Sequence, residues 1–210
     1  MGTALTFVIA FVLGSIPTGA IAGRLAGVDL RQHGSGNLGA TNAFRILGPR
    51  YGTPVLIIDI IKGAIPVLLI APLFAATSPL GPTGIRALAG LAAVAGHIWS
   101  PFVGFRGGKG VATAAGAFLA LSPLGALAAI VVWAVLAMST RYFSVGSLGA
   151  SLVLPFAVWF ETRLRGTPQP WILITSAALL TVAIVIRHRS NIARLRRGEE
   201  NRFGRFRGGG

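Results

Sequence analysis

The densest group of side chains suited to binding an anion lies between Asp29 and Arg45. Three glycines in this segment allow the backbone to turn several N–H groups toward one point and form an anion-binding nest. Short neutral donors and one guanidinium, whose planar fork suits phosphate, accompany them. A helix that begins near Ala40 would add the positive end of its dipole. The candidate residues are Gly34, Ser35, Gly36, Asn37, Gly39, Thr41, Asn42 and Arg45.

Two other interpretations of this segment compete with a phosphate site. The glycine spacing from Gly34 to Gly39 matches the dinucleotide fingerprint by letters, but no strand precedes it and no βαβ unit surrounds it. The sequence therefore does not support dinucleotide binding. A flexible loop between two membrane spans is the remaining alternative. The density of donors together with Arg45 favours the phosphate site.

A second segment places a lysine among glycines. Gly107, Gly108 and Gly110 leave Lys109 unshielded at the start of the next predicted helix, where a point charge and a helix dipole suit a phosphate. The segment is not a Walker A loop, because Lys109 is followed by glycine, so ATP is not supported as a substrate. The alternative is that Lys109 extends to the membrane interface. His97 is expected to be a packed, hydrogen-bonded side chain.

The third segment opens the basic C-terminal region. On a helix, His188, Asn191 and Arg194 recur at i, i+3 and i+6 and face one way, so His188 and Asn191 are candidates to line a site. The alternative is a basic patch that holds anionic lipid, and this is the role expected for the other arginines of the region. They are Arg196, Arg197, Arg202, Arg205 and Arg207.

Two smaller features carry polar groups within or between apolar runs. Asp59 and Lys62 stand at i and i+3 in the second run. A charge inside a membrane costs of order 3 kcal/mol, so we expect a buried structural ion pair that also braces the polar loop. The short polar joint at residues 141–147 offers hydroxyl groups, Ser147 among them, that could complete a pocket.

The composition indicates that lipid is the solvent of this chain. It has 210 residues, of which 53% are hydrophobic and 11% charged, whereas soluble domains carry about a quarter charged residues. The net charge of +14 fits an anionic membrane surface or a phosphorylated ligand, and no folded basic module indicates nucleic acid. The absence of Cys excludes disulfides, thiolate metal sites and Cys nucleophiles. We expect no metal and no cofactor.

The apolar runs predict an all-α, polytopic membrane protein. They are Thr3–Gly23, Thr53–Ala76, Ala87–Val103, Val111–Thr140, Phe143–Phe160 and Trp171–Ile186. The fourth run would be about 45 Å long as one helix, and Pro123 in its middle breaks the hydrogen-bond ladder. We therefore expect a short helix at residues 111–121 and a full pass at residues 123–140, which gives seven transmembrane helices.

Parity and charge predict the topology. The three donor-rich segments share one side of the membrane only if the fourth run is split. Basic residues crowd the first loop, the third loop and the tail, which the positive-inside rule assigns to the cytoplasm. The N-terminus is then extracytoplasmic and the C-terminus cytoplasmic, although Arg163 and Arg165 fall on the wrong side. We expect one membrane domain at residues 1–200 and a basic Arg/Gly-rich cytoplasmic tail at residues 201–210.

Taken together, the three segments resemble the bacterial acyl-phosphate:glycerol-3-phosphate acyltransferase family. The match covers nearly the whole chain in order, Asp59-x-x-Lys62-Gly63 included, and each long motif is far more specific than a lone glycine fingerprint. The long motifs are Gly34-Ser35-Gly36-Asn37-x-Gly39-Ala40-Thr41-Asn42-x-x-Arg45, Gly96-His97-x-x-x-Pro101-x-x-x-Phe105-x-Gly107-Gly108-Lys109-Gly110-x-Ala112-Thr113 and His188-x-x-Asn191-x-x-Arg194-Leu195-x-x-Gly198-x-Glu200.

The resemblance implies a seven-helix enzyme of the bacterial cytoplasmic membrane with its site facing the cytoplasm. It would transfer an acyl group from acyl phosphate to the 1-hydroxyl of glycerol 3-phosphate, yielding 1-acyl-glycerol 3-phosphate (lysophosphatidic acid) and phosphate in the first step of phospholipid synthesis. By the same resemblance, the Gly-rich loop with its Ser, Asn and Thr side chains cradles acyl phosphate. The polar site for glycerol 3-phosphate would consist of Arg45, Lys109, His188 and Asn191.

The residues are compatible with direct acyl transfer. The fifth position after each of His33, His97 and His188 is not Asp, so the His-x-x-x-x-Asp machinery of other acyltransferases is absent. The base is either His188 or a substrate phosphate, with a slight preference for the phosphate. A transporter of a phosphate-bearing solute is the rival function, but its anion site would lie near the midplane. The sequence leaves the oligomeric state open.

Overall fold

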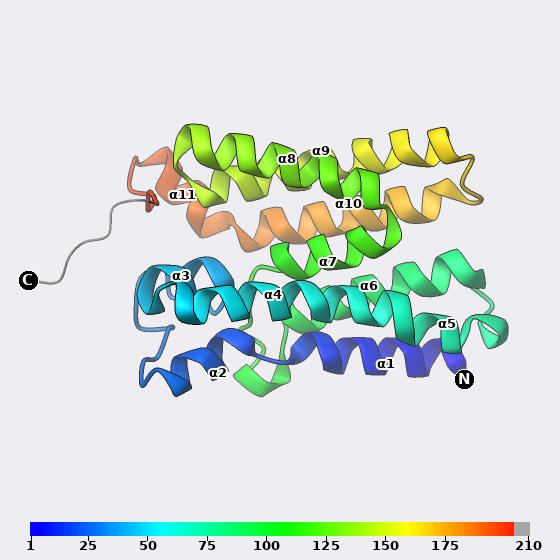
Figure 1. The fold of residues 1–210 in the computed structure, drawn as a ribbon, viewed down its shortest axis with the longest axis horizontal. Helices are drawn as coiled ribbons and strands as arrows, with labels where there is room; N and C mark the ends of the chain where they lie inside the picture. The colour runs from blue at the N-terminus through cyan, green and yellow to red at the C-terminus, as the bar shows by residue number, and fades with distance from the viewer. Residues whose placement is uncertain (204–210) are drawn as a thin grey trace, which may run out of the picture.

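The computed structural model describes residues 1–203, and over that range the chain is helical with no strand. This result confirms the predicted all-α class. The long helices run roughly antiparallel along the longest axis of the molecule, with the short α7 in the middle (Figure 1). The expected tail falls partly at residues 204–210, outside the described residues. The main helices are α1 (Gly2–Ser15), α2 (Thr18–Leu25), α3 (Ala40–Leu47), α4 (Pro49–Ile65), α6 (Gly81–Ile98), α7 (Val111–Leu121), α8 (Pro123–Thr140), α9 (Phe143–Arg165), α10 (Pro170–Arg187) and α11 (Arg189–Arg196).

Within residues 1–203, five helical segments are long and apolar enough to cross a bilayer, and the short apolar helix α7 accompanies them. The expected break in the fourth apolar run is confirmed, since α7 ends at Leu121 and α8 begins at Pro123. A buried carboxylate supports this break: Glu161 of α9 accepts hydrogen bonds from the Ser122 hydroxyl and from the Gly125 backbone N–H. The segments long enough to cross are Gly2–Leu25, Pro49–Leu73, Pro123–Thr140, Phe143–Arg165 and Pro170–Arg187.

The first apolar run is not one continuous helix as predicted, because it breaks at Ile16 and Pro17 into α1 and α2. Proline interrupts the helical hydrogen-bond ladder, and side chains from elsewhere bind the carbonyls that are freed. Ser100 donates to the Ser15 carbonyl over 2.6 Å, and the Lys62 ammonium donates to the Ile16 carbonyl over 2.9 Å. The carbonyls freed by this break are therefore satisfied by groups from two other segments.

Asp59 and Lys62 form the expected buried ion pair, with 2.8 Å between Oδ1 and Nζ. Thr18, in the first turn of α2, donates to the same carboxylate oxygen over 2.6 Å. The Nδ1 atom of His97 lies 3.7 Å from it. The pair therefore braces the break between α1 and α2, which is a more specific role than the general support predicted for the polar loop.

The third apolar run is displaced from its predicted bounds of 87–103. Helix α6 begins at Gly81, with Pro82 in its first turn, and it includes Arg86, which donates to the Ala120 carbonyl over 3.1 Å. It ends at Ile98, after which residues 101–103 form a 3₁₀ turn. The polar start and the proline-containing end explain why hydropathy misplaced both ends.

Glycines bring the helices of the interior into backbone contact. A Cβ on Gly14 would meet the Ala93 carbonyl oxygen at 2.0 Å, which places α1 directly against α6. Likewise, a Cβ on Gly116 would meet the Ile60 carbonyl oxygen at 1.9 Å, which places α7 directly against α4. Small residues permit such close packing of membrane helices. Close contact with α4 fixes the position of α7, whose first residue follows Gly110.

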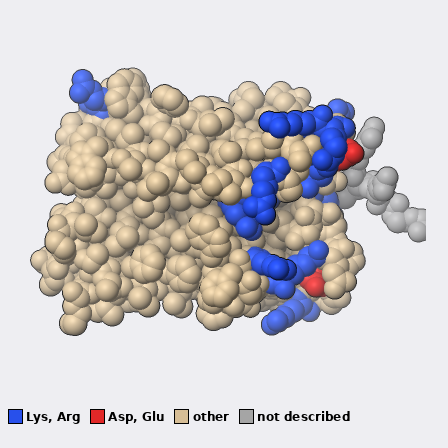
Figure 2. All heavy atoms as spheres, turned by 180° about the vertical axis from the view of Figure 1, so that it is seen from behind, with Lys and Arg blue, Asp and Glu red and all other residues tan. Residues whose placement is uncertain are grey.

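Basic residues gather over one end of the molecule (Figure 2). This is the end that carries α2, α3 and α11 (Figure 1). At the C-terminal end of α9, Arg165 pairs with the buried Glu161 over 2.9 Å, so its charge is partly compensated there. Arg165 is one of the two arginines that the predicted topology puts on the side opposite to the positive-inside rule. Its pairing with Glu161 is a physical reason why a basic residue is tolerated at that position.

Candidate active site

One cavity of about 330 Å³ brings the three donor-rich segments together and continues into the apolar interior. Its polar end receives side chains from the Gly-rich loop, from the lysine segment and from the start of α11. Its apolar part lies between α4, α7, α8 and α9, and its walls include Leu56, Phe118, Leu119, Ala126, Ala129, Ile130, Trp133 and Leu154. The cavity thus combines a cationic mouth with a channel suited to a hydrocarbon chain.

The glycines of the first segment shape its loop. Gly34 and Gly36 have φ values of 62° and 68°, which side chains rarely adopt, and neither residue lines the cavity. The N–H groups of this loop are largely used within it, since Gly36 donates to the His33 carbonyl and Gly39 donates to the Asn37 side chain. The expected nest of free backbone donors is therefore reduced. Donors for an anion come mainly from side chains and from the first turn of α3, which begins at Ala40 as predicted.

The side chain of Asn42 holds the backbone of the Gly-rich loop in place. Its side chain is 1% exposed, and its amide donates to the carbonyls of Leu30 and His33 over 3.0 and 3.1 Å. Its oxygen accepts from the Ser35 N–H over 2.9 Å. Since both ends of the amide are engaged, Asn42 holds the loop that presents Ser35 to the cavity.

The lysine segment is anchored to the end of α6. The N–H groups of Gly107 and Gly108 donate to the carbonyls of Ile98 and His97, both over 3.1 Å. A Cβ on Gly108 would meet the His97 ring at 2.1 Å, so the buried His97 packs directly against this backbone. Gly110, with φ of 86°, then starts α7. Lys109 is thereby directed into the cavity, whereas Gly107 and Gly108 support it without lining the cavity.

The third segment meets Lys109 in a buried network centred on Glu200. The Lys109 ammonium donates to the Asn191 side-chain oxygen, and the Asn191 amide donates to Glu200 over 2.7 Å. Arg194 forms an ion pair with the other oxygen of Glu200 at 2.7 Å, and Ser144 donates to Glu200 over 3.2 Å. This arrangement orients Asn191 and leaves the ammonium at the polar end of the cavity.

Electrostatics favour binding of an anion at this end. Burial lowers the pKa of Lys109 from 10.5 to about 8; Glu200 opposes the change, while Arg194 and Arg45 add to it. Burial likewise lowers the pKa of Arg45. Two confined cations near one another are unfavourable in the empty site, and a bound phosphate would relieve both effects.

His188 is a weak base in this structure. Burial and the nearby Lys109 lower its pKa to about 4. Its Nδ1 atom lies 2.8 Å from the Ile184 carbonyl, which can only accept, so the proton is on Nδ1. Nε2 then carries the lone pair. The ring is neutral at physiological pH and can accept a hydrogen bond through Nε2.

Most of the candidate residues line this one cavity. They are Ser35, Asn37, Gly39, Thr41, Asn42, Arg45, Lys109, Gly110, Ser147, His188 and Asn191. The candidates that do not line it are Gly34, Gly36, Gly107 and Gly108. Ser144 also lines the cavity, and it belongs to the polar joint at residues 141–147 whose hydroxyl groups were expected to complete a pocket. Glu200 lines the cavity as well, although the sequence indicated it only as a motif position. Asp59 and His97 reach the wall as well.

The fold and this cavity define a helical membrane protein with a phosphate-suited site at the head of a hydrophobic channel. Residues 4–198 match the family described as Glycerol-3-phosphate acyltransferase. The chain belongs to this glycerol-3-phosphate acyltransferase family, as the sequence resemblance predicted.

Relatives of this family resemble the chain over nearly its whole length. A glycerol-3-phosphate acyltransferase of Trichlorobacter lovleyi is 44% identical over 194 residues, which cover 92% of this chain and 94% of the relative. That of Rubrobacter xylanophilus is 43% identical over 206 residues, which cover 98% of each. The crystal structure of PlsY, an integral membrane glycerol 3-phosphate acyltransferase, superposes in its glycerol 3-phosphate form with a TM-score of 0.83 at 40% identity, covering 97% of this chain and 96% of PlsY. Its lysophosphatidic acid form gives 0.81 at 39% identity with the same coverage.

Proposed function

We propose that this chain transfers a fatty acyl group from acyl phosphate to the 1-hydroxyl of glycerol 3-phosphate, releasing 1-acyl-glycerol 3-phosphate and phosphate. The observation that carries the proposal is the single cavity in which Arg45 and Lys109 stand at the head of an apolar channel. The cations suit two phosphates, and the channel suits the acyl chain. The names of the relatives and of the two PlsY forms support glycerol 3-phosphate as acceptor and lysophosphatidic acid as product.

In this reaction the hydroxyl oxygen attacks the carbonyl carbon of the acyl phosphate. A new ester bond forms, the bond from that carbon to the phosphate oxygen breaks, and phosphate leaves with the electron pair. The leaving group is good, so no covalent enzyme intermediate is needed. Lys109 and Arg45 would stabilise the charge that develops on the phosphates, an effect worth a few kcal/mol for each well-placed donor.

The proton of the attacking hydroxyl goes to an oxygen of a substrate phosphate rather than to a protein side chain. The low pKa of His188, about 4, makes its ring a poorer proton acceptor than a phosphate dianion, whose second pKa is about 6. His188 would instead accept a hydrogen bond from the hydroxyl at Nε2 and orient it. Asn191 would hold Lys109, and Glu200 would hold Asn191.

The proposal includes the topology that brings substrates to the site. The five long segments, together with α6 and α7, make seven crossings. This number puts the N-terminus outside and the C-terminus in the cytoplasm of a bacterial cell. The basic end of the molecule, where the cavity has its polar residues, then faces the cytoplasm, as the positive-inside rule favours (Figure 2). Soluble glycerol 3-phosphate would enter there, while the acyl chain arrives from the bilayer.

The test is an assay of purified protein with glycerol 3-phosphate and three alternative donors: acyl phosphate, acyl-CoA and acyl carrier protein. We expect monoacyl product with acyl phosphate alone, together with an equal amount of phosphate. Product formation with a thioester donor but not with acyl phosphate would refute the proposed donor. Accumulation of labelled glycerol 3-phosphate in proteoliposomes without acylation would instead support the transporter.

A further inference from the structure

A second cavity lies behind the Gly-rich loop, at the basic end of the molecule. It measures about 730 Å³, and we call it the arginine groove. Its lining shares no residue with that of the active-site cavity, although Leu38, in its wall, stands between two residues that line the other cavity. The residues that define the groove are Ala20, Arg24, Asp29, Arg31, Phe102 and Arg106.

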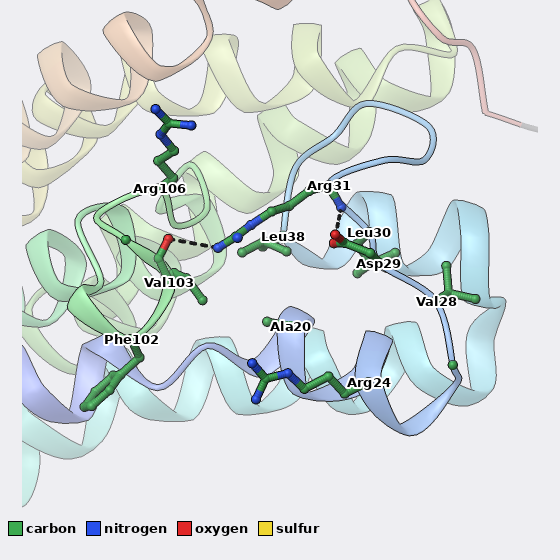
Figure 3. A pocket seen from close by; sticks show the side chains of 12 residues that line it. Ala20, Arg24, Val28, Asp29, Leu30, Arg31, Leu38, Phe102, Val103 and Arg106 are labelled. Atoms are coloured by element: carbon green, nitrogen blue, oxygen red, sulfur yellow. Dashed lines mark hydrogen bonds between the residues drawn. The ribbon is translucent and has the colours of Figure 1, made fainter.

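Three arginines from three separate segments line the arginine groove. Arg24 comes from α2, Arg31 from the loop that follows it, and Arg106 from the segment before Lys109. In Figure 3, Arg31 reaches across to the Val103 carbonyl, with Arg106 above it and Arg24 below it. The Arg31 hydrogen bond to that carbonyl is 2.8 Å long and fixes the guanidinium in place.

The positive charge of the groove is not neutralised within residues 1–203, where no ion pair involves these three arginines. The one acidic residue in the wall, Asp29, accepts instead from the Arg31 backbone N–H over 3.0 Å and from the Gln32 amide over 3.3 Å. The carboxylate is therefore occupied in shaping the loop. A cavity of this size with three such cations has the chemistry to bind a phosphate.

Exposed apolar side chains accompany the charged residues of the groove. On α2, Ala20 and Arg24 line the groove, while the adjacent row, Ile21 and Leu25, is 45% and 74% exposed. Phe102, which lines the groove from the turn at residues 101–103, is 60% exposed. A soluble phosphate compound would not use these apolar side chains, whereas a phospholipid would lay its acyl chains along them.

We propose that the arginine groove binds an anionic glycerophospholipid of the surrounding bilayer, with its phosphate among Arg24, Arg31 and Arg106 and its chains against Ile21, Leu25 and Phe102. Guanidinium groups bind phosphate through paired hydrogen bonds, which favours this headgroup over a zwitterionic one whose cation would meet the arginines. This site is separate from the one that carries out acyl transfer.

The experiment measures phospholipid binding to the intact chain by native mass spectrometry, in detergent micelles with graded phosphatidylglycerol or phosphatidylcholine. The test variant is Arg24→Gln/Arg106→Gln. Arg31 is left in place because it holds the Val103 carbonyl. The matched control is Arg50→Gln/Arg196→Gln, which removes the same charge from exposed positions outside both cavities. Acyl transfer in phosphatidylcholine micelles should be unchanged in both double variants and verifies that they are folded.

We expect the first phosphatidylglycerol to bind more tightly than phosphatidylcholine. The groove variant should weaken that binding by about 10- to 30-fold, since each basic residue near an anionic headgroup contributes about 1 kcal/mol. The control should weaken it by less than about threefold, because isolated exposed charges are screened. An equal loss in both variants, or equal binding of the two lipids, would overturn the proposal. Displacement of the lipid by millimolar glycerol 3-phosphate would also overturn it and would assign the groove to a soluble phosphate compound.

Discussion

Replacing Lys109 with Gln tests the central cation of the proposed site. Glutamine is neutral and one bond shorter than lysine, so the substitution removes the charged group that now donates to the Asn191 oxygen while keeping a polar amide at this position. The pKa of Lys109 falls from 10.5 to about 8 in the empty cavity, which corresponds to about 3 kcal/mol against the charged form. A phosphate bound beside Lys109 would stabilise the charged ammonium again, by an energy of that order.

We therefore expect Lys109→Gln to lower kcat/KM for acyl transfer by about 100-fold, since 1.36 kcal/mol corresponds to a factor of ten in rate. The assay is formation of monoacyl product from acyl phosphate and glycerol 3-phosphate at pH 7, where wild-type Lys109 is mostly protonated. Arg196→Gln, which removes an exposed charge from α11 outside the cavity, serves as the control and should retain activity. A loss of less than about fivefold in Lys109→Gln would refute the argument that this charge stabilises the transition state.

Three further outcomes follow from the same contacts. Because only protonated Lys109 carries the charge, kcat/KM should fall as the pH rises through about 8. Lys109→Arg, at whatever activity it retains, should shift this fall to higher pH. A fall at the same pH in both proteins would assign the titration to another group. Gly116→Ala should lower both the thermal midpoint and activity, since its Cβ would meet the Ile60 carbonyl oxygen at 1.9 Å and overpacking typically costs about 1–3 kcal/mol. Gly149→Ala is the control: its Cβ would press against the flexible end of Leu136, so the loss of stability should be small. Glu161→Ala should destabilise the protein by about 1–3 kcal/mol, because it leaves the Ser122 hydroxyl and the Gly125 N–H buried without an acceptor, yet it should leave kcat near wild type. A thermal midpoint equal to that of wild type would contradict this assignment.

Local chain chemistry was enough to predict several parts of the fold. Pro123 marked the division between α7 and α8, and the donor-rich segment before Ala40 marked the start of α3. The i, i+3 spacing of Asp59 and Lys62 inside an apolar run predicted their ion pair, since neither charge is tolerated alone in lipid. Each of these features depends on residues that are close in sequence.

What the sequence could not supply depends on partners far along the chain. The helix break at Pro17 persists because Lys62 and Ser100 bind the freed carbonyls, and hydropathy carries no sign of either contact. The Gly-rich loop was expected to offer its backbone donors to an anion, but the side chains of Asn42 and Asn37 accept two of them, the N–H groups of Ser35 and Gly39. Glu200 lies close in sequence to Asn191, but its burial became visible only once α11 was placed against Lys109.

The most direct test of the account is a structure of this protein with glycerol 3-phosphate bound. We predict that the phosphate lies in the cavity within hydrogen-bonding distance, about 2.7–3.2 Å between heavy atoms, of both Lys109 and Arg45, with a free hydroxyl directed toward His188. A phosphate found elsewhere, for example among Arg24, Arg31 and Arg106, with the cavity unoccupied at saturating ligand, would contradict the assignment of the active site.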